Sequence, residues 1–174
     1  MTARTTIGTI PLVFVVLGAG ALAPGAVRAA TPSEVRSLRG LAGVEVVVEN
    51  PTDELITLGL NTDQVRADVQ SRLQERGVAV VTSSDRAPGR PWLYIRVFAV
   101  KSAGAPNLAY FVTAQLRQDV SLDRNPDSHC GASTWDASAG GFASPETVAP
   151  TVRNAAQDVA DTFITDFLSA NAKR

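Results

Sequence analysis

The sequence predicts an α+β fold, a two-layer sandwich in which a mostly antiparallel sheet of about five strands carries two helices on one face. Residues 92–101 and 108–122 are long strand-like runs, joined by a connector that contains Gly, Pro and Asn. Two other segments repeat apolar residues at helical spacing. The predicted order is β-α-β-β-β-β-α, and helices packed on one side of such a sheet form a two-layer sandwich.

The amino terminus has the pattern of a secretory signal. Arg4 precedes an apolar run over residues 7–22, and Val27-Arg28-Ala29 provides the small or aliphatic pair that a signal peptidase requires. The run is shorter than the ~20 apolar residues that span a bilayer. We therefore expect residues 1–29 to be a cleaved signal peptide rather than an anchor, residues 30–40 a linker, and residues 41–174 a single domain. The mature protein would be periplasmic or secreted, with no membrane span.

The first strand and the first helix have clear boundaries. Residues 44–49 are rich in β-branched side chains and end at Asn50-Pro51, and residues 51–59 are predicted to be a loop. Asn61, or alternatively Thr62, caps a helix whose apolar residues recur every four positions. Gly77 ends this helix.

The rest of the chain is read as a meander followed by a second helix. Residues 78–81 form a short strand, and residues 92–101, apolar on both sides, form an interior strand. Residues 108–122 alternate as in a half-buried strand. We expect a turn at 123–128, a weakly marked strand at 130–139, a hinge-like connector from Gly140-Gly141 to Pro145, and a helix at 151–170.

Composition excludes several classes of function. The chain has 17 acidic and 16 basic residues and a net charge of −1, so nothing indicates binding to nucleic acid or to an anionic membrane surface. The single cysteine, Cys130, has no second cysteine for an internal disulfide. It is buried, reactive or paired with another chain.

Catalytic and metal-binding chemistry is also poorly supported. Asp127-Ser128-His129-Cys130 is the one place where a nucleophile and a base are close in sequence, but neighbours in a strand point to opposite sides. A metal site would need Asp123 as well, in a spacing that matches no zinc pattern. We predict no catalytic residue, no metal and no cofactor. Three acids of the last helix are expected to be solvated: Asp158, Asp161 and Asp166.

A resemblance to known proteins rests on short segments spread over most of the mature chain: Leu38-Arg39-Gly40-Leu41 with residues 44–49, Asp68-Val69, Arg72-Leu73, Gly77-Val78, Leu93-Tyr94, Leu116-Arg117-Gln118, Thr134-Trp135, Phe163-Ile164 and Phe167-Leu168. In these segments the chain resembles a family of small, exported bacterial proteins of uncharacterised function, and its element order is similar to α/β modules of cell-envelope assembly proteins. The segments consist of fold-forming residues, and the resemblance implies no catalytic residues.

These observations favour a non-catalytic exported domain that binds an envelope protein or a second copy of itself. If both helices cover one face of the sheet, the apolar residues on the other face of the 92–101 strand remain available for docking, as does any unpaired strand edge. The predicted contact residues are Trp92, Tyr94, Arg96, Phe98 and Phe111.

A second hypothesis comes from another class of function. In it the chain is a small-molecule binder or hydrolase with a cleft near His129, Trp135 and the Gly140-Gly141 segment. Aromatic residues in strands more often belong to the core, so this alternative depends on whether Trp135 is accessible.

Overall fold

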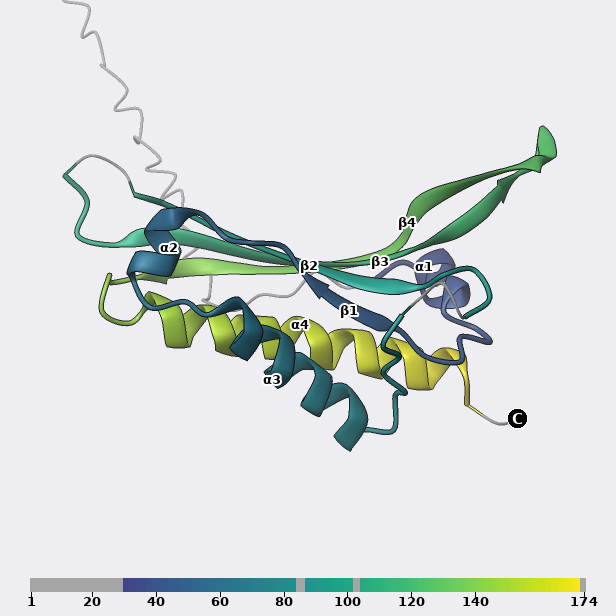
Figure 1. The fold of residues 1–174 in the computed structure, drawn as a ribbon, viewed down its shortest axis with the longest axis horizontal. Coiled ribbons are helices and arrows are strands. Elements are labelled where there is room, and N and C mark those ends of the chain that lie inside the picture. The colour runs from purple at the N-terminus through teal and green to yellow at the C-terminus, as the bar shows by residue number, and fades with distance from the viewer. Residues whose placement is uncertain (1–29, 84–86, 102–103, 173–174) are drawn as a thin grey trace, which may run out of the picture.

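The computed structural model describes residues 30–83, 87–101 and 104–172, and it confirms the α+β class (Figure 1). The predicted signal peptide, residues 1–29, lies outside the described residues. One four-stranded sheet has the order β1-β2-β3-β4, with β1 parallel to β2 and the other neighbours antiparallel. The elements are α1 (Pro32–Ser37), β1 (Glu45–Val48), α2 (Asp53–Thr57), α3 (Thr62–Glu75), β2 (Trp92–Lys101), β3 (Leu108–Leu122), β4 (Asn125–Ala143) and α4 (Val148–Ala170).

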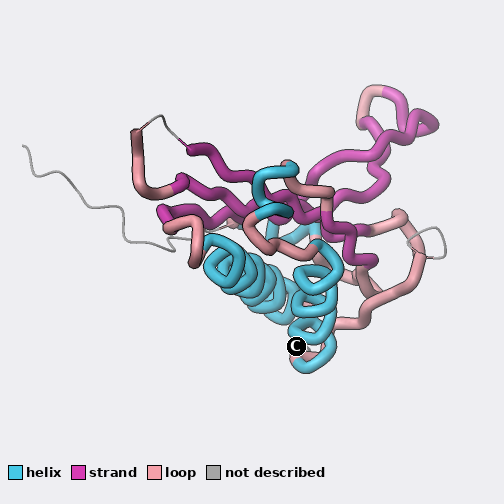
Figure 2. Tube along the Cα trace, turned by 60° about the vertical axis from the view of Figure 1, so that its left-hand side comes forward, coloured by secondary structure: helices cyan, strands magenta, loops and turns pink. Residues whose placement is uncertain are grey.

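The two long helices lie side by side on one face of the sheet, as predicted (Figures 1 and 2). Helix α3 packs on β1, and α4 packs beneath β3 and β4. The core between the layers contains the buried residues of α4 and the inward side chains of β2 and β3. Trp135 of β4 meets Phe163 of α4 edge to face, with ring centroids 5.1 Å apart.

The boundaries of α3 follow the predicted capping chemistry. The Asn61 side chain accepts hydrogen bonds from the backbone N–H groups of Asp63 and Gln64, which have no partner inside the helix. At the other end Gly77 has φ +82°, and the Val78 N–H donates to the Leu73 carbonyl in a Schellman motif. The apolar stripe of α3 is buried.

The predicted linker at residues 30–40 is wrong, because Pro32–Ser37 form the helix α1. Thr31 and Glu34 make a reciprocal capping box at its start. Leu38, directly after the helix, is completely buried in the core. Leu38 and the hydrogen bond from Ser37 to the Thr134 carbonyl both tie this segment to the domain, which its polar composition does not reveal.

Four further predictions about the elements need correction. The sheet has four strands rather than five, because residues 78–81 make only an isolated bridge between Val80 and Val44. Residues 53–57, predicted as loop, form α2, which buries Leu55. The turn predicted at 123–128 is confined to residues 123–124, and β4 starts at Asn125. Gly140 and Gly141 are not a hinge, since β4 pairs with β3 as far as Ala143.

The β3–β4 hairpin extends beyond the other strands as a two-stranded arm, defined here as residues 118–132. Pairing of β2 with β3 ends at Arg117, whereas β3 and β4 remain paired to the tip. Figure 1 shows the arm rising away from the helices, with a bulge at its base. The backbone N–H of Asp119 donates to the Gly89 carbonyl, so the loop before β2 braces the arm.

Candidate interaction surface

The sheet presents one face to the helices and leaves the other open. In β2 the odd-numbered residues from Leu93 to Ala99 are buried, while Arg96 and Phe98 on the opposite side are exposed. Because side chains alternate along a strand, the even-numbered residues of β2 and the odd-numbered residues of β3 share this open face. All five predicted contact residues, Trp92, Tyr94, Arg96, Phe98 and Phe111, lie on it.

One end of the open face is an apolar patch made of Phe98, Val100, Phe111 and Phe142. These side chains are 37, 58, 47 and 73% exposed. The register places Phe98 opposite Phe111 and Phe142 opposite Ala109, so the patch crosses three neighbouring strands. Exposed apolar side chains that gather in this way on a sheet are typical of interaction surfaces.

The patch has a defined internal geometry. The rings of Phe98 and Phe111 are stacked, with centroids 5.2 Å apart and planes 16° apart. On its other side Phe111 lies over Gly140, where an added Cβ would be 2.9 Å from Phe111 Cδ1. The missing side chain at Gly140 thus allows the ring to lie flat across the sheet, which is a physical reason for the glycine predicted to be a hinge.

The other end of the open face is a polar hollow of about 390 Å³, lined by Glu49, Tyr94, Arg96, Phe98, Thr113, Gln115 and Arg117. Glu49 accepts a hydrogen bond from the Tyr94 hydroxyl at 2.7 Å and pairs with Arg96 at 3.1 Å. The bond to Glu49 raises the pKa of Tyr94, and burial adds to this.

Arg117 carries the second cation of the hollow. Its guanidinium lies over the Tyr94 ring, 5.0 Å from the centroid, in a cation–π contact. Among the described residues no carboxylate pairs with Arg117. The hollow therefore combines two guanidinium groups with one carboxylate and can accept a further acidic group.

Among the described residues, Trp135 and His129 of the second hypothesis do not line a common cleft. Trp135 is 1% exposed, and its Nε1–H donates to Asp166 Oδ2 of α4 at 2.9 Å. His129 lies on the exposed arm against Ser121, six residues from Trp135, or about 20 Å along an extended strand. Trp135 is a core residue, so the two predicted site residues do not converge on one site.

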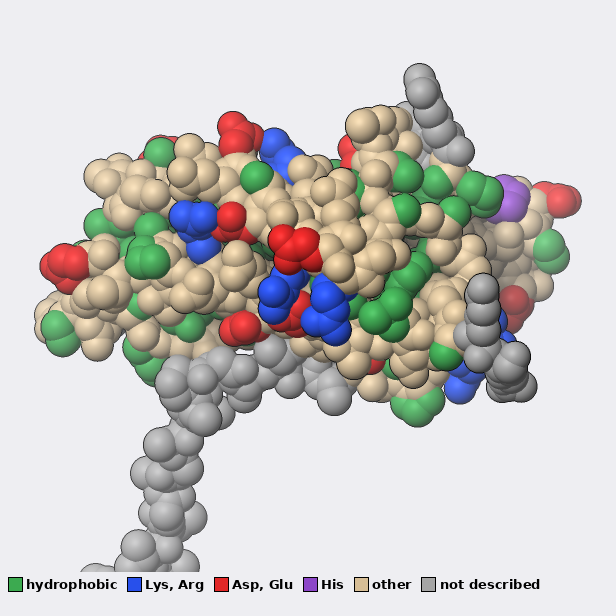
Figure 3. Space-filling model, turned by 90° about the horizontal axis from the view of Figure 1, so that it is seen from below, with side chains coloured by type: hydrophobic (Ala, Val, Ile, Leu, Met, Phe, Trp, Pro, Cys, Tyr) green, Lys and Arg blue, Asp and Glu red, His purple; other side chains and the backbone are tan. Residues whose placement is uncertain are grey.

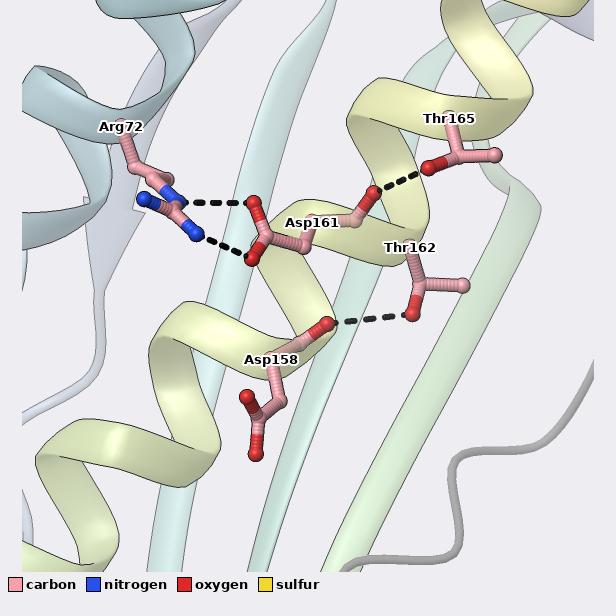
Figure 4. A network of polar contacts seen from close by, with 5 residues as sticks. All are labelled: Arg72, Asp158, Asp161, Thr162 and Thr165. Atoms are coloured by element: carbon pink, nitrogen blue, oxygen red, sulfur yellow. Dashed lines mark hydrogen bonds and ion pairs between the residues drawn. The ribbon is translucent and has the colours of Figure 1, made fainter.

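The structure also places the other residues considered for chemistry, which are Cys130 and the acids of α4. Cys130 is exposed on the arm, so of its three predicted states the buried thiol is wrong. Asp161 and Asp166 are not merely solvated: Asp161 accepts two hydrogen bonds from Arg72, and Asp166 accepts one from Trp135. Asp158 is exposed, as expected (Figure 4).

The helical face differs from the open face in its charge pattern. Arg72 pairs with Asp161 and Arg153 pairs with Asp68, and each pair joins α3 to α4 through two hydrogen bonds. Figure 3, seen from the helix side, shows acidic and basic side chains next to each other near the middle of this face. The charges on this side largely satisfy one another within the fold.

Within the described residues no group of three or more His, Cys, Asp and Glu side chains is arranged to hold a metal ion. Likewise, no helix of the described chain has the length and apolarity needed to cross a membrane. These two findings concern only the part of the sequence that the structure describes.

Comparisons with known proteins do not identify a family for this chain. No protein family and no curated protein matches the chain. Among solved structures the chain is similar to a PelC dodecamer from Paraburkholderia phytofirmans, at 15% identity, over 82% of this chain and 98% of that one, with a TM-score of 0.43. A likeness this distant identifies neither a family nor a function.

Proposed function

We propose that this chain is a non-catalytic, exported domain that binds a protein of the cell envelope through the open face of its sheet. The observation that carries the proposal is the apolar patch, in which Phe98, Val100, Phe111 and Phe142 stay exposed on the face without helices. Export is supported by the signal pattern of residues 1–29. The envelope setting is proposed from the element order, which is similar to that of α/β modules of cell-envelope assembly proteins.

The composition of the open face fits protein recognition. Aromatic and arginine side chains are enriched in protein interfaces, and Trp, Tyr and Arg most often contribute the largest share of the binding energy. Phe98 and Phe111 hold each other in place by stacking, and Arg117 is held on Tyr94. A surface whose anchors are already ordered loses less entropy on binding.

The two ends of the face describe the binding segment chemically. Apolar side chains of the bound protein would cover Phe98 and Phe111, and an acidic side chain would enter the polar hollow beside Arg117. We therefore expect a segment that carries apolar residues followed by Asp or Glu.

Photo-crosslinking in living cells tests this proposal directly. A benzophenone amino acid is placed at Phe98 or at Phe111, and at Gln74 on the exposed side of α3 as the matched control. The proposal expects a discrete adduct with another envelope protein from the two sheet positions and none from Gln74. Adducts that form from Gln74 alone, or from no position, would refute it. Replacing Arg117 with Gln should weaken the adduct without changing the melting temperature.

A further inference from the structure

Strand β4 is an edge of the sheet, and its outward backbone groups can be identified. The Glu49 N–H donates to the Ile95 carbonyl, so the odd-numbered residues of β2 turn toward β1 and the even-numbered ones toward β3. The same alternation continues through the pairing of β2 with β3 and of β3 with β4. It places the N–H and C=O groups of Ser138, Gly140 and Phe142 on the side of β4 that faces away from the sheet.

This edge is unprotected over residues 137–143. Within residues 30–83, 87–101 and 104–172 no group donates a hydrogen bond to, or accepts one from, the outward backbone groups of Ser138, Gly140 or Phe142. Further along the edge, Ser37 of α1 donates to the Thr134 carbonyl and closes that part. Edge strands usually carry a charged residue, often Lys, or a proline that prevents pairing with another strand. Residues 137–143 contain no charged residue and no proline.

We propose that a second copy of this chain pairs with β4 in antiparallel orientation and continues the sheet across a two-fold axis at Gly140. This proposal concerns the edge of the sheet and does not depend on the function assigned to its open face. In this register Gly140 lies opposite Gly140, and Ser138 of each copy lies opposite Phe142 of the other. The outward backbone groups of both strands then become hydrogen-bonded pairs.

The edge is self-complementary in size and charge. Phe142 is 73% exposed in one copy, and it would pack against Ser138 of the other, whose small side chain leaves room for the ring. Pairing brings no like charges together, since Asp136 would lie opposite Ser144 rather than another acid. The fit of side-chain sizes and the absence of facing like charges favour pairing with a second copy of β4 over pairing with a charged strand of another protein.

Helix α4 leaves room for the second copy. It contacts both β3 and β4, so its axis lies roughly between them. With strands ~4.8 Å apart, the two copies of α4 would lie about 10 Å apart, the distance at which helices pack. Helical periodicity directs Thr151 and Ala155 to the flank of α4 beneath the β4 edge, and both side chains are small enough for such contact.

Light scattering of the protein that accumulates after export of the full chain tests the proposal through two matched variants. Ser138→Lys with Phe142→Lys places like charges opposite each other twice, and should raise the dimer dissociation constant by about tenfold or more. Ser138→Glu with Phe142→Lys removes the same phenylalanine but pairs opposite charges, and should restore the dimer. The mass of a monomer for the natural protein at high concentration, or equal dissociation constants for the two variants, would overturn the proposal. Neither result would alter the crosslinking expected from Phe98.

Discussion

Arg72 of α3 donates two hydrogen bonds to the carboxylate of Asp161 on α4, at 2.8 and 2.7 Å, and so joins the two helices that cover the sheet (Figure 4). The hydrogen bond from Arg72 holds the pKa of Asp161 below its usual value. A carboxyl group whose pKa is lowered by folding stabilises the folded state above its unfolded pKa of about 3.9. That contribution is lost as the pH falls through the lower, folded pKa.

The Asp161→Asn variant should therefore be less stable than the natural protein near neutral pH and should approach it in strong acid. Melting temperatures measured from about pH 7 to about pH 2 test this. Other titrating groups, such as Asp119 beside Arg90, are present in both proteins and cancel in the comparison. Asp158→Asn on the exposed side of α4 is the control and should melt like the natural protein. A melting difference of constant size across the range would contradict the assignment.

Gly140→Ala should destabilise the fold by about 1–3 kcal/mol, because the added methyl group overpacks a filled site. Its Cβ would lie 2.9 Å from Phe111 Cδ1 and 3.0 Å from the Tyr110 carbonyl oxygen, and the latter is part of the sheet backbone. Gly131→Ala is the matched control on the same strand, since nothing lies within 4 Å of its Cβ. Urea denaturation of both variants measures the difference. Equal midpoints for both would show that Phe111 does not rest on Gly140.

Leu38→Ala should cost about 2–5 kcal/mol, the usual range for truncating a fully buried leucine. The loss would show that α1 and the residue after it belong to the folded domain. Arg39→Ala changes the exposed neighbour and should leave the unfolding free energy nearly unchanged. If Leu38→Ala unfolds at the same urea concentration as Arg39→Ala, the amino-terminal helix is not anchored through Leu38.

Val69→Asp should destabilise the protein by several kcal/mol, on the order of the largest effects of single core substitutions. Val69 is completely buried in the stripe of α3, so an aspartate there would lose its contact with solvent. Ala67→Asp introduces the same side chain on the exposed side of the helix as a control. Equal melting temperatures for the two variants would show that α3 does not pack against the core through Val69.

Cys130 should react with a maleimide as completely in the folded protein as in denaturant, because its thiol is exposed on the β3–β4 arm. Mass spectrometry after a short native labelling measures the modified fraction. Protection of the thiol until denaturant is added would mean that the arm is covered by another chain or by a segment of its own.

The predictable parts of the fold are those where local chemistry and burial agree. The cap at Asn61 and the glycine at 77 mark both ends of α3 in the sequence, and the structure confirms them. The alternation in residues 92–101 and 108–122 predicts which side chains face outward, and therefore the exposure of Phe98 and Phe111. These patterns depend only on neighbours in sequence.

The errors arise where a distant part of the chain decides the local structure. β4 is built largely of Ala, Gly and Ser, so its length is set by pairing with β3 rather than by its own propensity. Leu38 and α1 are ordered by contact with β4 and α4, which a polar sequence does not indicate. Asp161 looks like a solvated acid until Arg72, 89 positions earlier, is placed beside it. Likewise, the sequence does not show that Trp135 belongs to the core, because its indole nitrogen donates to Asp166, 31 positions later.

The arm formed by residues 118–132 projects from the four-stranded part of the sheet. Past Arg117 it rests on one pair of strands, so its amide hydrogens should exchange with solvent much sooner than those of the four-stranded body. The sole thiol and the sole imidazole of the chain both sit near its tip. A spin label or fluorophore attached to Cys130 would report any movement of the arm from a position outside the core.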